Sequence, residues 1–232
     1  MYISRVELAV HRIDAMRLVS SPYRLHAAVG ASMPVQNESP SETGRVLWRI
    51  DKAPCEDALW LYIVSPHQPD LASIAAQTGA LGSCSWAARD YDSVLQRLQK
   101  GQVWQFRLKA NPVRKVRVDR GRVGYHPKTD VVGTIQGHVT EMQQRNWLLE
   151  RAERNGFVVC RDDEGNERMR VSQRRREEFK RGKQKVTLAT AQYDGLLEVV
   201  DADVFKRTLM CGLGRGKGFG CGLMTIAPAH NL

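Results

Sequence analysis

The order of strand-like and helix-like segments in the first hundred residues restricts the fold more than any other feature of this sequence. Alternating apolar and polar residues indicate half-buried strands, and apolar residues at helical spacing indicate helices. The expected strands cover 2–10, 45–50, 58–64 and 83–89, and the expected helices cover 23–33 and 71–77. This β-α-β-β-α-β order is typical of the ferredoxin-like fold, whose two helices cover one face of a four-stranded antiparallel sheet. A further helix over 92–100 is expected to follow it.

The second half of the chain repeats this plan. Its expected strands cover 103–109, 157–160, 167–172, 185–200 and 223–227, and its expected helices cover 139–155 and 202–211. The turn-forming residues Asp162–Asn166 separate two of these strands and predict that the two pair as a hairpin. The sequence therefore predicts an α+β protein of two tandem ferredoxin-like domains, residues 1–95 and 96–232.

The excess of positive over negative charge lies entirely in the second half of the chain. Residues 1–100 contain 10 Lys or Arg and 10 Asp or Glu, whereas residues 101–232 contain 25 and 15, which accounts for the net charge of +10. A polyanion, with nucleic acid as the leading candidate, is therefore expected to bind mainly to the second half. The alternative is a basic surface that serves only solubility.

The chain has no apolar run long enough to span a membrane and no apolar segment typical of a signal peptide near its first residue. We therefore expect a cytoplasmic protein without a membrane partner. The five cysteines include no Cys-x-x-Cys pair and have no histidine cluster beside them, which predicts reduced thiols rather than a zinc site. No cofactor and no metal are expected.

Glycine occupies every second position from Gly212 to Gly222. Glycine lets a backbone approach a ligand closely, and Arg215 and Lys217 add positive charge within the same loop. We predict that Gly214, Arg215, Gly216 and Lys217 contact a phosphate backbone. The Walker pattern is not met, because the residue after Lys217 is Gly218. The alternative is a turn that needs glycine only for tight packing.

Two further segments are rich in basic residues. Residues 107–128 contain eight Lys or Arg and a single acidic residue, whereas residues 161–185 contain ten basic and six acidic residues. The cations of the second segment would gain affinity for RNA by releasing counterions. Its mixed charges are also compatible with a solvated surface loop that binds nothing. The predicted RNA contacts from these segments are Arg107, Lys109, Arg161, Arg168, Arg170, Lys183 and Lys185.

Tyr23 and His26 are three residues apart on a helix expected to begin at Pro22, so both side chains project from one face. RNA can be cut without a metal when its own 2′-hydroxyl attacks the adjacent phosphate. One group then removes that proton and another protonates the leaving 5′-oxygen. Histidine suits either role near neutral pH, and the tyrosine could hydrogen-bond the hydroxyl or the phosphate. The alternative is a purely structural histidine.

Three segments together resemble one family. They are Ser21-Pro22-Tyr23-Arg24-Leu25-His26 after the first strand, Phe106–Pro112 in mid-chain, and the glycine-rich segment near the end. They resemble the CasE family, the CRISPR repeat-processing endoribonucleases of type I-E systems, over nearly the whole chain.

The resemblance implies two ferredoxin-like domains that bind the stem-loop of the CRISPR repeat. It implies a cut on the 3′ side that leaves a 5′-hydroxyl and a 2′,3′-cyclic phosphate, and continued association with the guide RNA as a Cascade subunit. Tyr23 and His26 match the catalytic pair, the glycine-rich segment would contact RNA, and the hairpin Arg161–Arg170 would enter the major groove. Related enzymes often add a catalytic lysine, but no lysine precedes Lys52. Arg24, or a cation from the second domain, could replace it.

Two other functions are compatible with the basic surfaces. A non-catalytic RNA-binding subunit would need the cations but not His26. A ribosome-associated protein would prefer ribosomal RNA to CRISPR repeats.

Overall fold

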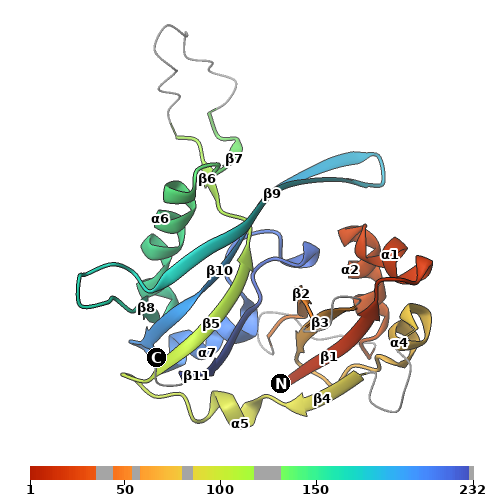
Figure 1. Cartoon of the computed structure of the whole chain (residues 1–232), viewed down its shortest axis with the longest axis horizontal. Helices are drawn as coiled ribbons and strands as arrows, with labels where there is room; N and C mark the ends of the chain where they lie inside the picture. Colours follow the sequence, from red (N-terminus) through yellow and green to blue (C-terminus); the bar gives the residue numbers. More distant parts are fainter. Residues whose placement is uncertain (35–43, 54–57, 80–85, 118–131, 230–232) are drawn as a thin grey trace, which may run out of the picture.

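The N-terminal part of the chain forms a four-stranded antiparallel sheet with strand order β2-β3-β1-β4 (Figure 1). The computed structural model describes residues 1–34, 44–53, 58–79, 86–117 and 132–229. The strands of this sheet are β1 (Tyr2–Ala9), β2 (Leu47–Lys52), β3 (Ala58–Ser65) and β4 (Trp86–Asp90). Most of the loop expected at 34–44, and the start of the strand expected at 83, lie outside the described residues.

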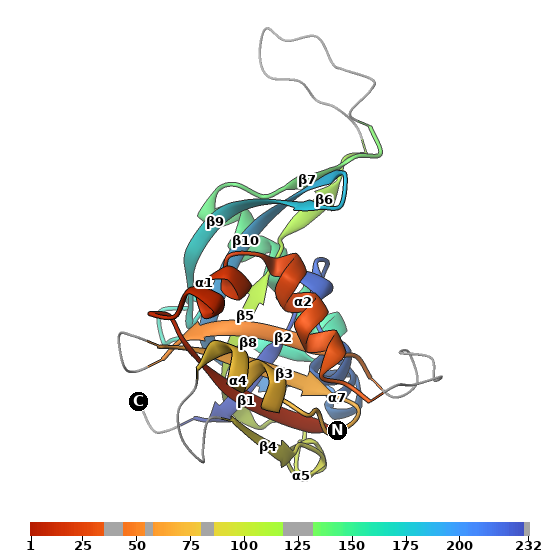
Figure 2. The same ribbon diagram turned by 90° about the vertical axis from the view of Figure 1, so that its right-hand side faces the viewer.

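Three helices cover one face of this sheet: α1 (Ile13–Val19), α2 (Pro22–Ala31) and α4 (Ala72–Thr78) (Figure 2). Leu25 and Val29 of α2 are buried against the apolar face of β1 and β3, in a core that also includes Leu61 and Ile63. The helix α1 was not predicted, because its seven residues bury only Ala15 and Leu18 and carry little apolar periodicity.

The C-terminal part contains a five-stranded antiparallel sheet with strand order β11-β5-β10-β8, and β9 also pairs with β10. Helices α6 and α7 contribute Trp147, Leu148, Phe205 and Leu209 to its core. The elements of this sheet are β5 (Val103–Ala110), α6 (Glu141–Ala152), β8 (Phe157–Val159), β9 (Met169–Arg181), β10 (Gln184–Val199), α7 (Ala202–Cys211) and β11 (Met224–Pro228). Short additional elements are α5 (Asp92–Leu95), β6 (Val113–Lys115), β7 (Ile135–Gly137), η2 (Glu153–Asn155) and η3 (Lys217–Phe219).

Each sheet places its four topological strands in the order expected of a β-α-β-β-α-β unit, so the predicted tandem ferredoxin-like fold is confirmed. We call the two units the N-terminal and the C-terminal domain. The boundary between residues 95 and 96 stays a prediction. Leu47 and Val64 of the N-terminal sheet, together with Leu95 and Leu98, belong to the same buried cluster as the C-terminal core.

Two predicted elements differ in the structure. The helix expected at 92–100 ends at Leu95 and continues as turns. The strands expected to pair with each other around Asp162–Asn166 instead follow one another along the same edge of β10, because β8 pairs with 197–199 and β9 with 184–195. An isolated bridge and an ion pair, both between Arg161 and Glu167, link the two arms of that turn. The long hairpin of this domain is β9–β10, which turns at Gly182.

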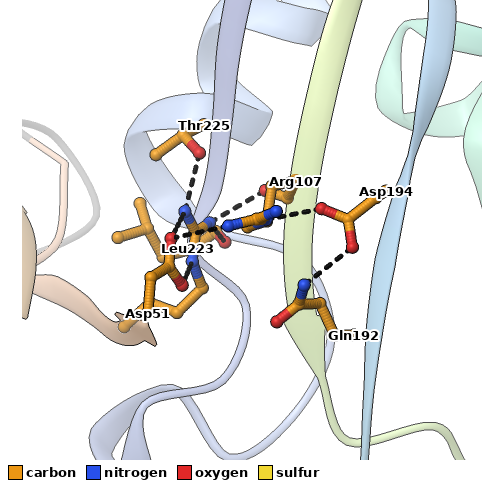
Figure 3. A network of polar contacts seen from close by, with 7 residues as sticks. Asp51, Arg107, Gln192, Asp194, Leu223 and Thr225 are labelled. Atoms are coloured by element: carbon orange, nitrogen blue, oxygen red, sulfur yellow. Dashed lines mark hydrogen bonds and ion pairs between the residues drawn. The ribbon is translucent and has the colours of Figure 1, made fainter. Parts of the chain in front are cut away.

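A buried polar network joins the two sheets (Figure 3). The Arg49 guanidinium on β2 donates to both carboxylate oxygens of Asp51, at 2.7 and 2.8 Å. It also donates to the Arg107 carbonyl on β5 at 2.9 Å and to Thr225 Oγ1 on β11 at 2.8 Å. Because a buried charge is costly without partners, this network favours one placement of the N-terminal sheet against the C-terminal sheet.

None of the helices in the described part of the chain is long and apolar enough to cross a membrane.

Candidate active site

Tyr23 and His26 both line an open cleft of about 670 Å³. Ser21 caps α2 by accepting a hydrogen bond from the Arg24 amide at 3.3 Å, and Pro22 occupies the first turn, where a missing N–H costs nothing. The helix therefore begins where the sequence predicted. Both side chains are exposed, and Leu25 between them faces the core. The local sequence is thus sufficient to present the pair on one solvent-facing surface.

The glycine-rich loop forms the other wall of the cleft. Residues Gly214–Phe219 line it, and a Cβ at Gly218 would lie 3.5 Å from His26 Cε1. The Phe219 ring meets the His26 ring edge-on, with ring centroids 6.3 Å apart. An isolated bridge between Asn111 and Arg215 ties the loop to the end of β5. The loop and α2 come from opposite ends of the sequence and form one site.

Two of the loop glycines are required for packing against β2 of the N-terminal sheet. Gly220 has a φ of +77°, and a Cβ there would lie 2.5 Å from the Trp48 ring on β2. At Gly212, with a φ of +73°, a Cβ would lie 2.9 Å from Leu47. Both positions need a left-handed backbone and a missing side chain. Gly214 and Arg215 are exposed, but a Cβ at Gly214 would also lie 3.1 Å from the Trp147 ring. The predicted RNA contacts of the loop therefore include a glycine that also packs within the protein.

Four cations line the same cleft as Tyr23 and His26: Arg45, Arg181, Arg215 and Lys217. The Lys217 ammonium donates to the Cys211 carbonyl at 2.7 Å. Burial, reinforced by the nearby Arg45 guanidinium, lowers the pKa of Lys217. The cleft thus places a tyrosine and a histidine among four positively charged side chains.

Arg45 and Arg181 were not among the predicted site residues. Arg45 directly precedes β2 and has no motif around it. Arg181 is the last residue of β9, whose hairpin with β10 passes over α1 and α2 (Figures 1 and 2). Only the folded chain brings either residue to His26.

The tip of the β9–β10 hairpin reaches the site through aromatic contacts. Phe179 on β9 meets Phe219 edge-on, with ring centroids 4.9 Å apart. A register shift in the ladder between Thr190 and Gln192, together with a φ of +46° at Gln173, marks a bulge where the hairpin bends. This hairpin therefore approaches the cleft that contains His26.

The turn at residues 161–168, which was predicted to form the basic hairpin, lies away from the cleft that contains His26. Residues 161–168 are at the far end of β9 from its tip, away from α2 (Figure 1). Arg161 pairs with Glu167 at 3.4 Å, and Arg168 lines a separate groove beside Tyr62 and Asp194. None of the predicted cations Arg161, Arg168 and Arg170 lines the cleft of His26.

The chain matches the family model described as CRISPR associated protein over residues 1–228. The chain belongs to this family. A CRISPR-associated endoribonuclease Cse3 from Thermus thermophilus is 24% identical over 241 residues, which cover 98% of this chain and 100% of the relative. These matches confirm the resemblance to the CasE family.

Two solved structures share the fold. Cse3 bound to a 19 nt RNA is 23% identical with a TM-score of 0.74, and the match covers 98% of this chain and 100% of that one. A chain of a CRISPR RNA-guided surveillance complex is 19% identical with a TM-score of 0.58, and the match covers 99% and 100%.

In this CRISPR-associated chain, several of the cations predicted to contact RNA form ion pairs with acidic residues of the protein itself. The Arg107 guanidinium pairs with Asp51 and Asp194, and Lys109 pairs with Glu177 at 3.0 Å. Lys185 pairs with Glu178 at 2.6 Å. These ion pairs would have to rearrange or share their charge for the three cations to hold RNA.

Two further predicted RNA contacts, Lys183 and Arg24, lie outside the cleft of His26. Lys183 is exposed in the turn of the β9–β10 hairpin. Arg24 is exposed on α2 but lines a different cleft, with Asp14 and Arg17, so it does not share the cavity of His26. In the described residues, no group of three or more His, Cys, Asp or Glu side chains could hold a metal ion.

Proposed function

We propose that this chain is a metal-independent endoribonuclease that binds the stem-loop of CRISPR repeats in precursor RNA and cuts on its 3′ side. The observation that carries the proposal is the single cleft that contains Tyr23, His26 and four cations. The named activity of the Cse3 relative supports ribonuclease chemistry in that cleft. The exposure of His26 to this cleft further supports a role beyond packing.

The chemistry would be an internal transfer. The 2′-oxygen attacks the adjacent phosphorus and loses its proton, the bond from phosphorus to the 5′-oxygen breaks, and the leaving oxygen gains a proton. The products are a 2′,3′-cyclic phosphate and a 5′-hydroxyl, so the step consumes no water. His26 would transfer one of these protons, and Tyr23 would hydrogen-bond the 2′-hydroxyl or the phosphate.

The RNA would be gripped mainly by the C-terminal domain. The exposed backbone at Gly214, the partly exposed backbone at Gly216 and the cations Arg215 and Lys217 would contact phosphates beside the cut. Lys183 and Lys185 on the β9–β10 hairpin would contact the stem. The 161–170 turn would contact RNA only outside the cleft.

We propose further that the protein remains with the mature guide RNA as a subunit of a cytoplasmic Cascade complex. The likeness to a chain of a CRISPR RNA-guided surveillance complex supports this partner. We also propose residues 1–95 and 96–232 as the domains that divide the work.

The test is cleavage of a repeat hairpin in EDTA, with analysis of the product ends. We expect the native protein to give a 2′,3′-cyclic phosphate and to leave a hairpin with a 2′-deoxy scissile nucleotide uncut. His26→Ala should lower the single-turnover rate about 100- to 10,000-fold, the usual range for a lost acid–base group. The control is His11→Ala, an exposed histidine of the same domain outside the cleft.

Undiminished cleavage by His26→Ala would contradict its assigned role. Tight binding without any cleavage by the native protein would instead identify a non-catalytic RNA-binding subunit. Stronger binding to ribosomal RNA than to the repeat would contradict the proposed substrate.

A further inference from the structure

We infer that a groove beside the cleft of His26 binds the base of one of the two nucleotides that flank the scissile phosphate. The inference rests on the proposed function and deepens it, because it adds recognition of a base to a site that so far contacts only phosphates and the 2′-hydroxyl. The groove has a volume of about 430 Å³, and its walls come from strand β2 of the N-terminal domain and strand β9 of the C-terminal domain.

The groove adjoins the cleft at two points. Phe219 lines both cavities, and its ring meets the His26 ring edge-on. Pro22 lines the groove, whereas the next residue along α2, Tyr23, lines the cleft. In a nucleotide, the base and the phosphate are joined through a single sugar. A phosphate held beside His26 therefore brings a neighbouring base to the groove.

The two cavities differ in charge. The described residues that line the cleft include four cations and no acidic residue. The groove instead balances three cations against three carboxylates, which are Lys52, Lys109 and Arg175 against Asp51, Glu177 and Glu178. A phosphate backbone favours the cationic cleft, whereas the groove suits an uncharged ligand with both hydrogen-bond donors and acceptors. A nucleobase is such a ligand.

Aromatic side chains in the groove favour a flat ligand. Trp48 contributes a ring from β2, Phe179 one from β9 and Phe219 one from the glycine-rich loop. The rings of Phe179 and Phe219 are both partly exposed and meet edge-on, so neither covers the face of the other. Unstacked bases of single-stranded RNA typically bind against such rings.

Glu177 supplies a hydrogen-bond acceptor whose position is fixed. It lies two residues before Phe179 on β9, so both side chains project from the same face of the strand. The Lys109 ammonium and the Thr190 hydroxyl both donate to Glu177 Oε1, at 3.0 and 2.9 Å. Within the described ranges, no hydrogen bond or ion pair reaches Oε2. This oxygen can accept an N–H from the Watson–Crick edge of a base.

The test is a double-mutant cycle between the protein and the RNA. Glu177→Gln and Phe179→Leu change the groove. Glu198→Gln is the control, because Glu198 is a partly exposed glutamate on β10 that lines neither cavity. On the RNA, the base of each nucleotide that flanks the cut is removed in turn, while its sugar and phosphate are kept. Kd is measured on these repeat hairpins with a 2′-deoxy scissile nucleotide, and cleavage of the unmodified hairpin locates the cut.

We expect the native protein to bind about tenfold more weakly when one of the two bases is missing, the usual effect of losing one stacked base. On the intact hairpin, Phe179→Leu should weaken binding by about the same factor and Glu177→Gln by about threefold. On the hairpin without that base, both variants should bind like the native protein, because the contact that they remove no longer exists. Glu198→Gln should match the native protein on both hairpins.

A displaced hairpin or loop would weaken binding to both hairpins equally. Equal losses on both, native binding of the intact hairpin by both variants, or a native protein indifferent to either base would overturn the inference. Circular dichroism establishes folding, and Glu177→Gln, which keeps the side chain's size, carries the test if Phe179→Leu does not fold. If the native protein does not cut the unmodified hairpin, the proposed function fails and the inference with it. If it cuts and one of the three contrary results is found, only the inference fails.

Discussion

The two domains share one sheet order but differ in what they attach to it. The first hundred residues, which include the N-terminal domain, have no net charge. This domain divides its first helical segment into α1 and α2, and α2 presents Tyr23 and His26. The C-terminal domain adds the glycine-rich loop and the long β9–β10 hairpin, and it carries all of the excess positive charge. Under the proposed function, one scaffold supplies acid–base groups in one copy and phosphate-binding groups in the other.

Neither domain forms the cleft by itself. Its lining comes from α2 and Arg45 on one side and from the loop and the hairpin tip on the other. The proposed activity therefore depends on the junction between the two domains.

The largest effect on stability is expected at the junction itself. Asp51→Ala leaves the buried Arg49 guanidinium without its carboxylate, which should lower the free energy of unfolding by about 3–5 kcal/mol. Urea unfolding measures this loss. Glu150→Ala, which removes the mostly exposed partner of Arg151, should cost less than about 1 kcal/mol. Equal losses in the two variants would show that the buried network does not hold the domains together.

A smaller loss is expected where the loop packs against the N-terminal sheet. Gly220→Ala combines a left-handed backbone with a Cβ 2.5 Å from the Trp48 ring, and should cost about 2–4 kcal/mol. Gly101 is also left-handed, with a φ of +86° and open space around its Cβ position, so Gly101→Ala should cost only about 1 kcal/mol. The difference measures the clash alone. Similar costs would mean that the loop moves away from β2 without penalty.

The fold could be predicted from sequence where local periodicity decides the element. The strands β1 and β5 alternate clearly, β3 is a short apolar run, and α2 has a serine cap, a proline and a spaced apolar face. The hairpin of the C-terminal domain could not be paired correctly, because Asp162–Asn166 is a strong turn signal whichever strands it separates. The register that places both β8 and β9 on β10 depends on long-range pairing.

Only the part of the site that lies on a single helix could be predicted from the sequence. The spacing of Tyr23 and His26 is a property of one helix, whereas the approach of Phe219, Arg45 and Arg181 to that helix depends on how the two domains pack. The glycine pattern indicated close backbone approach. The sequence could not tell that Gly212 and Gly220 approach Leu47 and Trp48 rather than a ligand.

The charge difference between the domains should also appear in binding. Arg215→Gln removes one expected phosphate contact from the C-terminal domain, and should reduce the slope of log Kd against log salt concentration by about one unit. The change should be the same for related hairpins, because a phosphate contact carries no base information. An unchanged slope would exclude Arg215 from direct phosphate contact.

The smallest effect concerns the packing of the glycine-rich loop within the C-terminal domain. Burial raises the pKa of the Cys221 thiol to about 12, so near pH 8 it is protonated as well as inaccessible. Cys211 is partly exposed. A thiol reagent at pH 8 should therefore label the peptide with Cys211 under native conditions and label the peptide with Cys221 only after denaturation. Equal labelling rates would show that the loop opens readily.

The central claim is that the N-terminal domain cuts RNA that the C-terminal domain holds. Its most direct test is Kd and the saturating single-turnover rate on one repeat hairpin in EDTA, measured side by side for His26→Ala and Arg215→Gln. The account predicts a native Kd and salt slope with a rate at least about 100-fold lower for His26→Ala. For Arg215→Gln it predicts a weaker Kd, a shallower slope and a rate close to native. Loss of binding in His26→Ala, or a large loss of saturating rate in Arg215→Gln, would contradict the division of labour between the two domains.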